Sequence, residues 1–220
     1  MRWPEGVLAD RSPYDSSALD PLMAAQAANA FLAHSQAFIE SLPTDPSQTE
    51  ATASLGDIVA SATCLSLSVE LFLKSLLIVT GCPVRPTHDL LALYDALSPA
   101  AQAAVQDEYE ALAADPGEGA VTLRLVYSHT PTAPPQESVT GDGARDASIR
   151  AVLERNRDAF SSWRYLHEIA LRGEIVIVDY EYFHLTALAS AVSNCCHRTI
   201  FGPGERRPPI PPVATIDPPR

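Results

Sequence analysis

The longest apolar segment of the chain does most to limit the folds open to it. From Thr52 to Thr80, apolar residues recur three and four positions apart and cover a broad face of one long helix: Leu55, Ile58, Val59, Ala62, Leu65, Val69, Phe72, Leu73, Leu76 and Leu77. Gly81 and Pro83 follow and predict where this helix ends. Because so wide an apolar face must be covered on several sides, the segment is expected to be a core helix.

The same spacing predicts helices on both sides of this segment. They span residues 16–42, a short stretch after the N-cap Thr87, residues 99–114 after the N-cap Ser98, residues 147–171 after Asp146, and residues 181–201. Two β-branched segments, VTLRLVY and EIVIVDY, are typical of short strands or irregular connections. The expected fold class is therefore all-α, an up-and-down bundle of four to five helices.

Proline and glycine indicate where the chain leaves the bundle. The length of 220 residues suits one domain, and the 19 prolines are unevenly placed along it. We assign residues 1–15 to an N-terminal extension, 16–201 to a single helical domain, 115–145 to a Pro/Gly-rich insertion loop within it, and 202–220 to a disordered Pro-rich tail.

Charge and composition exclude several functions. The net charge of −12 argues against a protein that coats nucleic acid nonspecifically, so any contact with RNA should be local. Residues 65–79 are too few to span a bilayer comfortably and carry Glu70 and Lys74, and the N-terminus has no apolar region behind Arg2. The cysteines have no CxxC spacing, and consecutive Cys195, Cys196 and His197 cannot face one metal. We expect a cytoplasmic protein with no membrane segment, metal or cofactor.

Charged residues inside two apolar helices suggest a structural contact. Glu70 and Lys74 are four positions apart, and so are Arg164 and Glu168, so each pair lies on one helix face. Both pairs interrupt apolar helix faces that must pack together. They predict a partly buried ionic network of all four residues, and the alternative is a salt bridge at the edge of the core.

The segment 146–172 is locally basic, with five arginines against four acids and a balance of +1. Its arginines make it a candidate surface for RNA or a partner protein, and a mixed-charge solvent face is the alternative. On the same helix, Phe160, Trp163 and His167 form a stripe of bulky residues at spacings of three and four. We expect this stripe to lie at a homodimer interface.

The order of these motifs resembles the HEPN domain family. The matching elements are ELFLKSLL in an apolar helix, a turn, a THDL helix start, and a later helix in which Arg-Asn precedes WRYLHE. The likeness covers most of residues 18–201, with 115–145 as an insertion. It implies a bundle that is commonly dimeric, found in toxin, antitoxin and defence proteins and beside nucleotidyltransferases, so the expected partners include an antitoxin or a nucleotidyltransferase.

The resemblance also implies candidate residues for RNA chemistry. HEPN ribonucleases use an arginine, often followed by Asn or Asp, and a histidine a few residues later. Arg155 and Asn156 match the first part, but Phe160 stands where the histidine would be, and phenylalanine cannot transfer a proton. We therefore expect a noncatalytic or weakly catalytic module that binds RNA or a partner through Arg155, Asn156, Arg157 and Arg164.

Two alternatives remain open. The first is a metal-independent endoribonuclease that uses Arg155 or Arg157 with His167 or His88. His167 lies 12 residues beyond Arg155, roughly three helical turns away, so the two would meet only between chains. The second alternative is a purely structural dimerisation protein without a role in RNA binding.

Overall fold

A computed structural model of the chain describes residues 20–40, 55–114, 123–127, 146–164 and 176–202. The elements are α1 (Pro21–Glu40), α2 (Leu55–Val79), α3 (Leu90–Asp95), α4 (Pro99–Ala113), β1 (Leu123–Tyr127), α5 (Ile149–Arg155), α6 (Ala159–Arg164), β2 (Val176–Tyr180) and α8 (Tyr182–Phe201). Apart from Tyr180 of β2, the core within these residues is formed by helices, which confirms the predicted all-α bundle.

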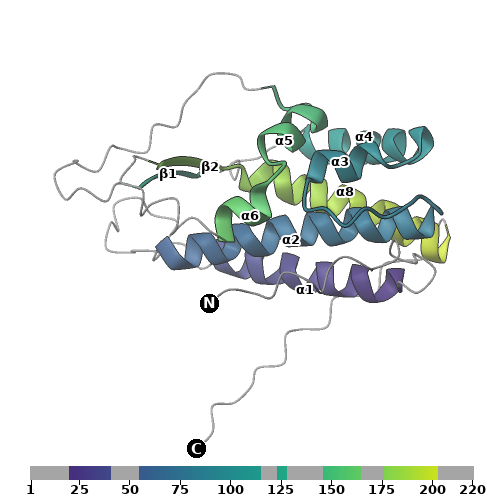
Figure 1. The fold of residues 1–220 in the computed structure, drawn as a ribbon, viewed down its shortest axis with the longest axis horizontal. Coiled ribbons are helices and arrows are strands. Elements are labelled where there is room, and N and C mark those ends of the chain that lie inside the picture. Colours follow the sequence, from purple (N-terminus) through teal and green to yellow (C-terminus); the bar gives the residue numbers. More distant parts are fainter. Residues whose placement is uncertain (1–19, 41–54, 115–122, 128–145, 165–175, 203–220) are drawn as a thin grey trace, which may run out of the picture.

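Helix α2 lies at the centre of this bundle. It packs against α1 on one side and α8 on the other, while α6 and α3 cover it above (Figure 1). Its residues Leu65, Val69, Phe72, Leu73 and Leu77 are fully buried, as the apolar pattern predicted. By length and composition alone, Gly56–Val79 is one helix of the described residues that could cross a membrane, and 61% of its most apolar window is buried in the structure.

The ends of the long helices follow local signals in the sequence. After α2, Gly81 has φ +70°, its N–H donates to Ile78 O at 3.0 Å, and the Cys82 N–H donates to Leu77 O at 2.8 Å. These two bonds satisfy the last carbonyls of the helix, and the left-handed conformation between them favours glycine. At the start of α4, Ser98 Oγ accepts from Ala101 N and proline occupies the first turn, as predicted.

Serine hydroxyls tie α1 to α2 by donating to backbone carbonyls across the helix contact. Ser68 Oγ donates to Ala28 O and Ser75 Oγ donates to Pro21 O, both at 2.8 Å. These bonds take the place of the hydrogen bonds to water that the hydroxyl groups lose when they are buried. The two serines therefore help to hold α1 and α2 close together.

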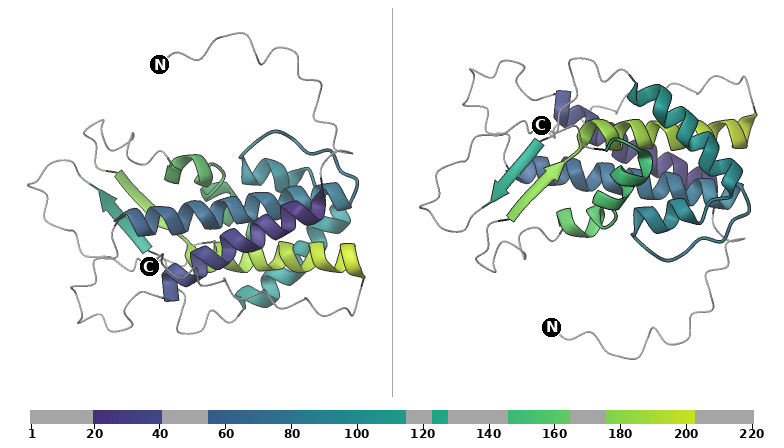
Figure 2. Two further views of the ribbon diagram at one scale, coloured as in Figure 1. Left: turned by 90° about the horizontal axis from the view of Figure 1, so that it is seen from below. Right: turned by 90° about the horizontal axis from the view of Figure 1, so that it is seen from above.

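The two β-branched segments form one antiparallel ribbon at the end of the bundle, as both views of Figure 2 show. Leu123 pairs with Tyr180 and Tyr127 pairs with Val176. At the bundle side, the Tyr180 hydroxyl lies 3.1 Å from Ser35 Oγ and 3.0 Å from Ser61 Oγ, and the two serine oxygens are 2.9 Å apart. This buried triangle of hydroxyls anchors β2, and so the start of α8, to α1 and α2.

The single helix predicted for residues 147–171 is wrong. Helix α5 ends at Arg155, three residues in turns follow, and α6 begins at Ala159. The buried side chain of Asn156 donates from Nδ2 to Val152 O at 2.9 Å, and Arg157 O accepts from Leu90 N at 3.0 Å. Because that carbonyl is bonded to the start of α3, it is turned out of a regular helix.

Smaller corrections concern caps and boundaries. Asp89, not Thr87, is the N-cap of α3, since Asp89 Oδ1 accepts from Ala92 N at 2.9 Å. The four cysteines are free, with Cys195 and Cys196 buried. The extension 1–15, most of the insertion 115–145, the tail beyond Gly202, His167 and Glu168 lie outside the described residues, so the predictions made for them stay predictions.

Candidate functional site

The break between α5 and α6 directs polar side chains into two separate groups. The Arg155 cluster contains Arg155, Asn156, Glu181, Tyr109 and His184 and lies where α5 meets the start of α8. The His88 cluster contains Glu70, Lys74, His88 and Phe160 and lies where α2, the start of α3 and α6 meet. Both therefore join elements that are distant in sequence.

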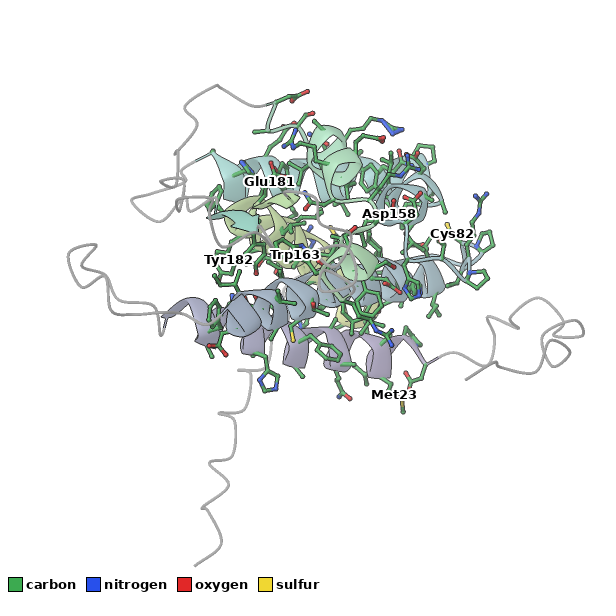
Figure 3. The ribbon with its side chains drawn as sticks, turned by 60° about the vertical axis from the view of Figure 1, so that its left-hand side comes forward. Met23, Cys82, Asp158, Trp163, Glu181 and Tyr182 are labelled. Carbon is green, nitrogen blue, oxygen red and sulfur yellow. The ribbon has the colours of Figure 1, made fainter. Side chains whose placement is uncertain are left out.

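Glu181 is the centre of the Arg155 cluster. It immediately precedes α8 and is labelled in Figure 3. Only 3% of it is exposed. Arg155 Nε donates to Glu181 Oε1 at 2.9 Å, and Asn156 Nδ2 donates to Oε2 at 2.8 Å. A buried carboxylate is stable only when such donors surround it. The two residues that match the HEPN ribonuclease pattern are thus both bonded to the protein's own carboxylate.

Tyr109 and His184 extend this cluster. The Tyr109 hydroxyl donates to Ala147 O at 2.8 Å and lies 2.9 Å from His184 Nδ1. Because the hydroxyl has one proton and gives it to the carbonyl, Nδ1 of His184 must be the donor to Tyr109. Burial raises the pKa of Tyr109 to about 12 and lowers the pKa of His184, so both groups are neutral near pH 7.

Glu70 is the centre of the His88 cluster and is 2% exposed. Lys74 Nζ donates to Glu70 Oε1 at 2.6 Å, and His88 Nδ1 lies 2.9 Å from Oε2 and 3.1 Å from Oε1. An ionised carboxylate accepts only, so Nδ1 of His88 is the protonated nitrogen. The His88 side chain is 56% exposed. In the neutral ring Nε2 therefore has a free lone pair, and no described residue bonds to it.

The ring of His88 lies against Phe160, with ring centroids 5.0 Å apart and an angle of 35° between the planes. The Arg164 guanidinium lies over the same Phe160 ring, 5.8 Å from its centroid. Next to His88, Asp89 Oδ2 accepts from Arg157 Nη2 at 2.6 Å. An imidazole from the start of α3 thus lies beside Phe160, the position where the family resemblance would place a histidine.

One pair of the predicted ionic network, Glu70 with Lys74, lies within the described residues, and the rest of that network stays a prediction. Glu70 and Lys74 form the expected pair, but the further group on Glu70 is His88, which the network prediction did not include. Arg164 lies over Phe160, and Glu168 is outside the described residues. The network had been predicted from helix spacing alone, which gives no information on the loop that carries His88.

The interface prediction is wrong for Trp163. Only 2% of this side chain is exposed within a single chain, and its ring packs edge-on against Tyr180 with centroids 5.5 Å apart. Figure 3 shows Trp163 inside the bundle, between α2 and the helices above it. The bulk of Trp163 therefore serves the intramolecular core. Phe160 is half-buried against His88, and His167 is not among the described residues.

Sequence reasoning missed Glu181, Tyr109 and His184. Each was assigned to a helix or a helix end without a role, because no short motif connects them to Arg155. One signal was present in the sequence: Glu181 directly follows the apolar strand segment VIVDY. A charged residue that is buried with such a segment needs a partner, because charged side chains are rarely buried unless they are paired. The described residues contain no group of three or more His, Cys, Asp or Glu side chains that could hold a metal ion.

Comparison with known proteins gives no relative from which a function could be transferred. No family model matches the chain, and no curated protein or solved structure matches it either. The functional assignment depends on the geometry of the two clusters.

Proposed function

We propose that this chain is a HEPN-like helical module that binds single-stranded RNA, and that its Arg155–Asn156 pair has a structural role. The observation that carries the proposal is the pair of hydrogen bonds that Arg155 and Asn156 donate to the two carboxylate oxygens of Glu181. Releasing Arg155 to a phosphate would leave a buried carboxylate short of a donor, at a cost of several kcal/mol. The module is therefore noncatalytic at the position where HEPN ribonucleases hold their arginine.

The RNA-binding surface in this proposal consists of His88, Arg157, Phe160 and Arg164 and is called the α3–α6 surface. Its support is an aromatic ring flanked by an imidazole and a guanidinium, since such planar groups stack on unpaired bases. Arg157 is paired with Asp89 and Glu154, which keeps the local charge low. RNA binding should consequently be modest in affinity and local. A toxin–antitoxin, nucleotidyltransferase-associated or phage-defence setting is proposed from the family resemblance.

Fluorescence anisotropy with a labelled single-stranded RNA tests the proposal. Arg164→Gln should weaken binding about fivefold, which corresponds to roughly 1 kcal/mol, and should reduce the salt dependence by about one phosphate contact. Arg198→Gln is the matched control, because Arg198 is also an exposed arginine but lies in the last turn of α8 and pairs with Glu108. Absence of RNA binding, or equal loss in both variants, would favour a partner protein over RNA.

A further inference from the structure

We infer that RNA binding at the α3–α6 surface is coupled to the uptake of a proton by His88, whose charged ring then donates from Nε2 to a phosphate oxygen. This inference rests on the proposed RNA binding and adds its regulation by pH. It requires no reaction of the RNA and no contact with the Arg155–Asn156 pair. Three observations carry it: the fixed bond at Nδ1, the exposure of the ring, and the balance of charge around it.

The bond between Glu70 and His88 Nδ1 is compatible with both charge states of the ring. An ionised carboxylate can only accept, so Nδ1 keeps its proton whether the ring is neutral or charged. The proton that is gained or lost is therefore the one on Nε2. Its uptake changes the charge of the α3–α6 surface without breaking the contact that holds the ring in place.

The exposure of His88 places the titrating nitrogen within reach of a ligand. The His88 side chain is 56% exposed, whereas Glu70 is almost wholly covered. Because Nδ1 faces this buried carboxylate, the exposed part of the ring is the opposite edge, which includes Nε2. Phe160 lies against the ring and supports it. A protonated Nε2 can thus donate to a group that arrives from solvent.

The charged groups that face His88 or pair with its neighbours come from α2, the start of α3, α5, α6 and the turn between α5 and α6. They are four acids and three basic groups: Glu70, Asp89, Glu154, Asp158, Lys74, Arg157 and Arg164. With a neutral imidazole the acids are in excess by one, and with a charged imidazole the two signs are equal. Since an excess of negative charge repels phosphates, the surface should accept RNA better in the protonated state.

Lys74 leaves the charge of a protonated His88 available to the ligand. Its Nζ lies 2.6 Å from Glu70 Oε1, so the buried carboxylate already has an opposite charge beside it. A proton on His88 is therefore not needed to neutralise Glu70, and it can strengthen a hydrogen bond to a phosphate oxygen. If RNA binds the protonated form more tightly, RNA binding must by linkage favour proton uptake.

The test measures RNA affinity of the full chain as a function of pH. Fluorescence anisotropy with a labelled single-stranded RNA is recorded from about pH 6 to about pH 8, where carboxylates stay ionised and histidine ordinarily titrates. Binding should be roughly tenfold tighter at the lower pH, as expected for one charge-assisted hydrogen bond. The salt dependence should also be steeper there by about one phosphate contact. Isothermal titration calorimetry in buffers of different ionisation enthalpy should show net proton uptake on binding.

Two substitutions of His88 separate its charge from its contacts. Both His88→Arg and His88→Gln keep a donor for Glu70, but only the arginine has a permanent charge. We expect His88→Arg to bind tightly across the pH range and His88→Gln to bind weakly across it, each without the wild-type pH dependence. His34→Gln is the matched control, because His34 is an exposed histidine on α1, and it should keep the wild-type pH dependence.

The outcomes distinguish this inference from the proposed function. RNA binding whose pH dependence is the same in wild type and His88→Gln overturns the role of His88 and leaves the binding function standing. Equal affinities of folded His88→Arg and His88→Gln at every pH also overturn it, since a structural histidine would be sensitive to both changes alike. Absence of RNA binding throughout the pH range overturns both proposals. If His88→Arg does not fold, as judged by circular dichroism, the calorimetric proton uptake of wild type and His88→Gln decides.

Discussion

Arg155 and Glu181 lie 26 positions apart in the chain, and Nε of the arginine is 2.9 Å from Oε1 of the glutamate. The contact joins the last residue of α5 to the residue before α8. Asn156 bonds the second oxygen of the same carboxylate, so the turn between α5 and α6 and the start of α8 are held by one side chain.

The first prediction compares two arginines of α5. Arg155→Ala leaves Glu181 buried with fewer donors and should lower the free energy of unfolding by about 2–4 kcal/mol. Arg150→Ala should cost less than about 1 kcal/mol, because Arg150 and its partner Asp95 are 61% and 43% exposed. Urea unfolding measures both. Equal losses would show that burial of Glu181 does not determine the strength of its contacts.

The second prediction concerns Lys74. In Lys74→Met, Glu70 keeps His88 as its side-chain partner, and the unfolding free energy should fall by about 3 kcal/mol, as for other buried pairs that lose one member. Arg198→Met, which removes an exposed partner of Glu108, should cost less than about 1 kcal/mol. A small loss in Lys74→Met would mean that His88 alone neutralises the carboxylate.

The third prediction is a pH dependence of stability that arises from His184. Burial lowers its pKa in the folded chain below the ordinary 6.5, so the unfolded chain binds more protons as the pH falls through and below that value. This contribution to stability is fully present above about pH 6.5 and is lost at lower pH. Melting temperatures of wild type and His184→Gln should converge or cross as the pH falls from 7.5 to 5. His34→Gln, an exposed control, should run parallel to wild type.

The fourth prediction tests the hydroxyl triangle of Ser35, Ser61 and Tyr180. Tyr180→Phe removes one hydroxyl and leaves two buried serine oxygens with fewer partners, at an expected cost of about 1–2 kcal/mol. Tyr94→Phe removes one longer bond, from the Tyr94 hydroxyl to Gln102 O at 3.3 Å, and should cost less. Thermal unfolding of the two variants makes the comparison. A larger loss in Tyr94→Phe would contradict the anchoring role of the triangle.

Local chemistry explains why much of the fold could be predicted. The start of α4 is encoded in two adjacent residues, Ser98 and Pro99, and the end of α2 in Gly81, because each acts on backbone groups within one turn. The apolar face of α2 is equally local in sequence, so its burial was predicted correctly. Features that depend on residues within about one helical turn of each other could therefore be predicted from the sequence.

Only part of the candidate site could be predicted from the sequence. The Glu70–Lys74 pair follows from spacing on one helix. The third member, His88, lies on a loop, and the hydrophobic periodicity of the sequence does not predict where a loop lies. The break after Arg155 depends on the bond between Leu90 N and Arg157 O, a tertiary contact. The helical pattern of residues 147–171 was real, since Ile149, Val152, Leu153 and Trp163 are all buried, but tertiary bonds interrupted the backbone beneath it.

The pairing of Tyr127 with Val176 brings together the two ends of a long excursion of the chain. The residues between them include α5 and α6, and therefore Arg155, Arg157 and Phe160. Since the excursion leaves and returns at neighbouring points, its length can change without displacing the helix that follows β2, and the closure cost grows only slowly with each added residue. The excursion thus supplies Arg155, Arg157 and Phe160, while the residues that hold them, Glu181 and the His88–Asp89 segment, belong to parts of the chain whose length it does not change.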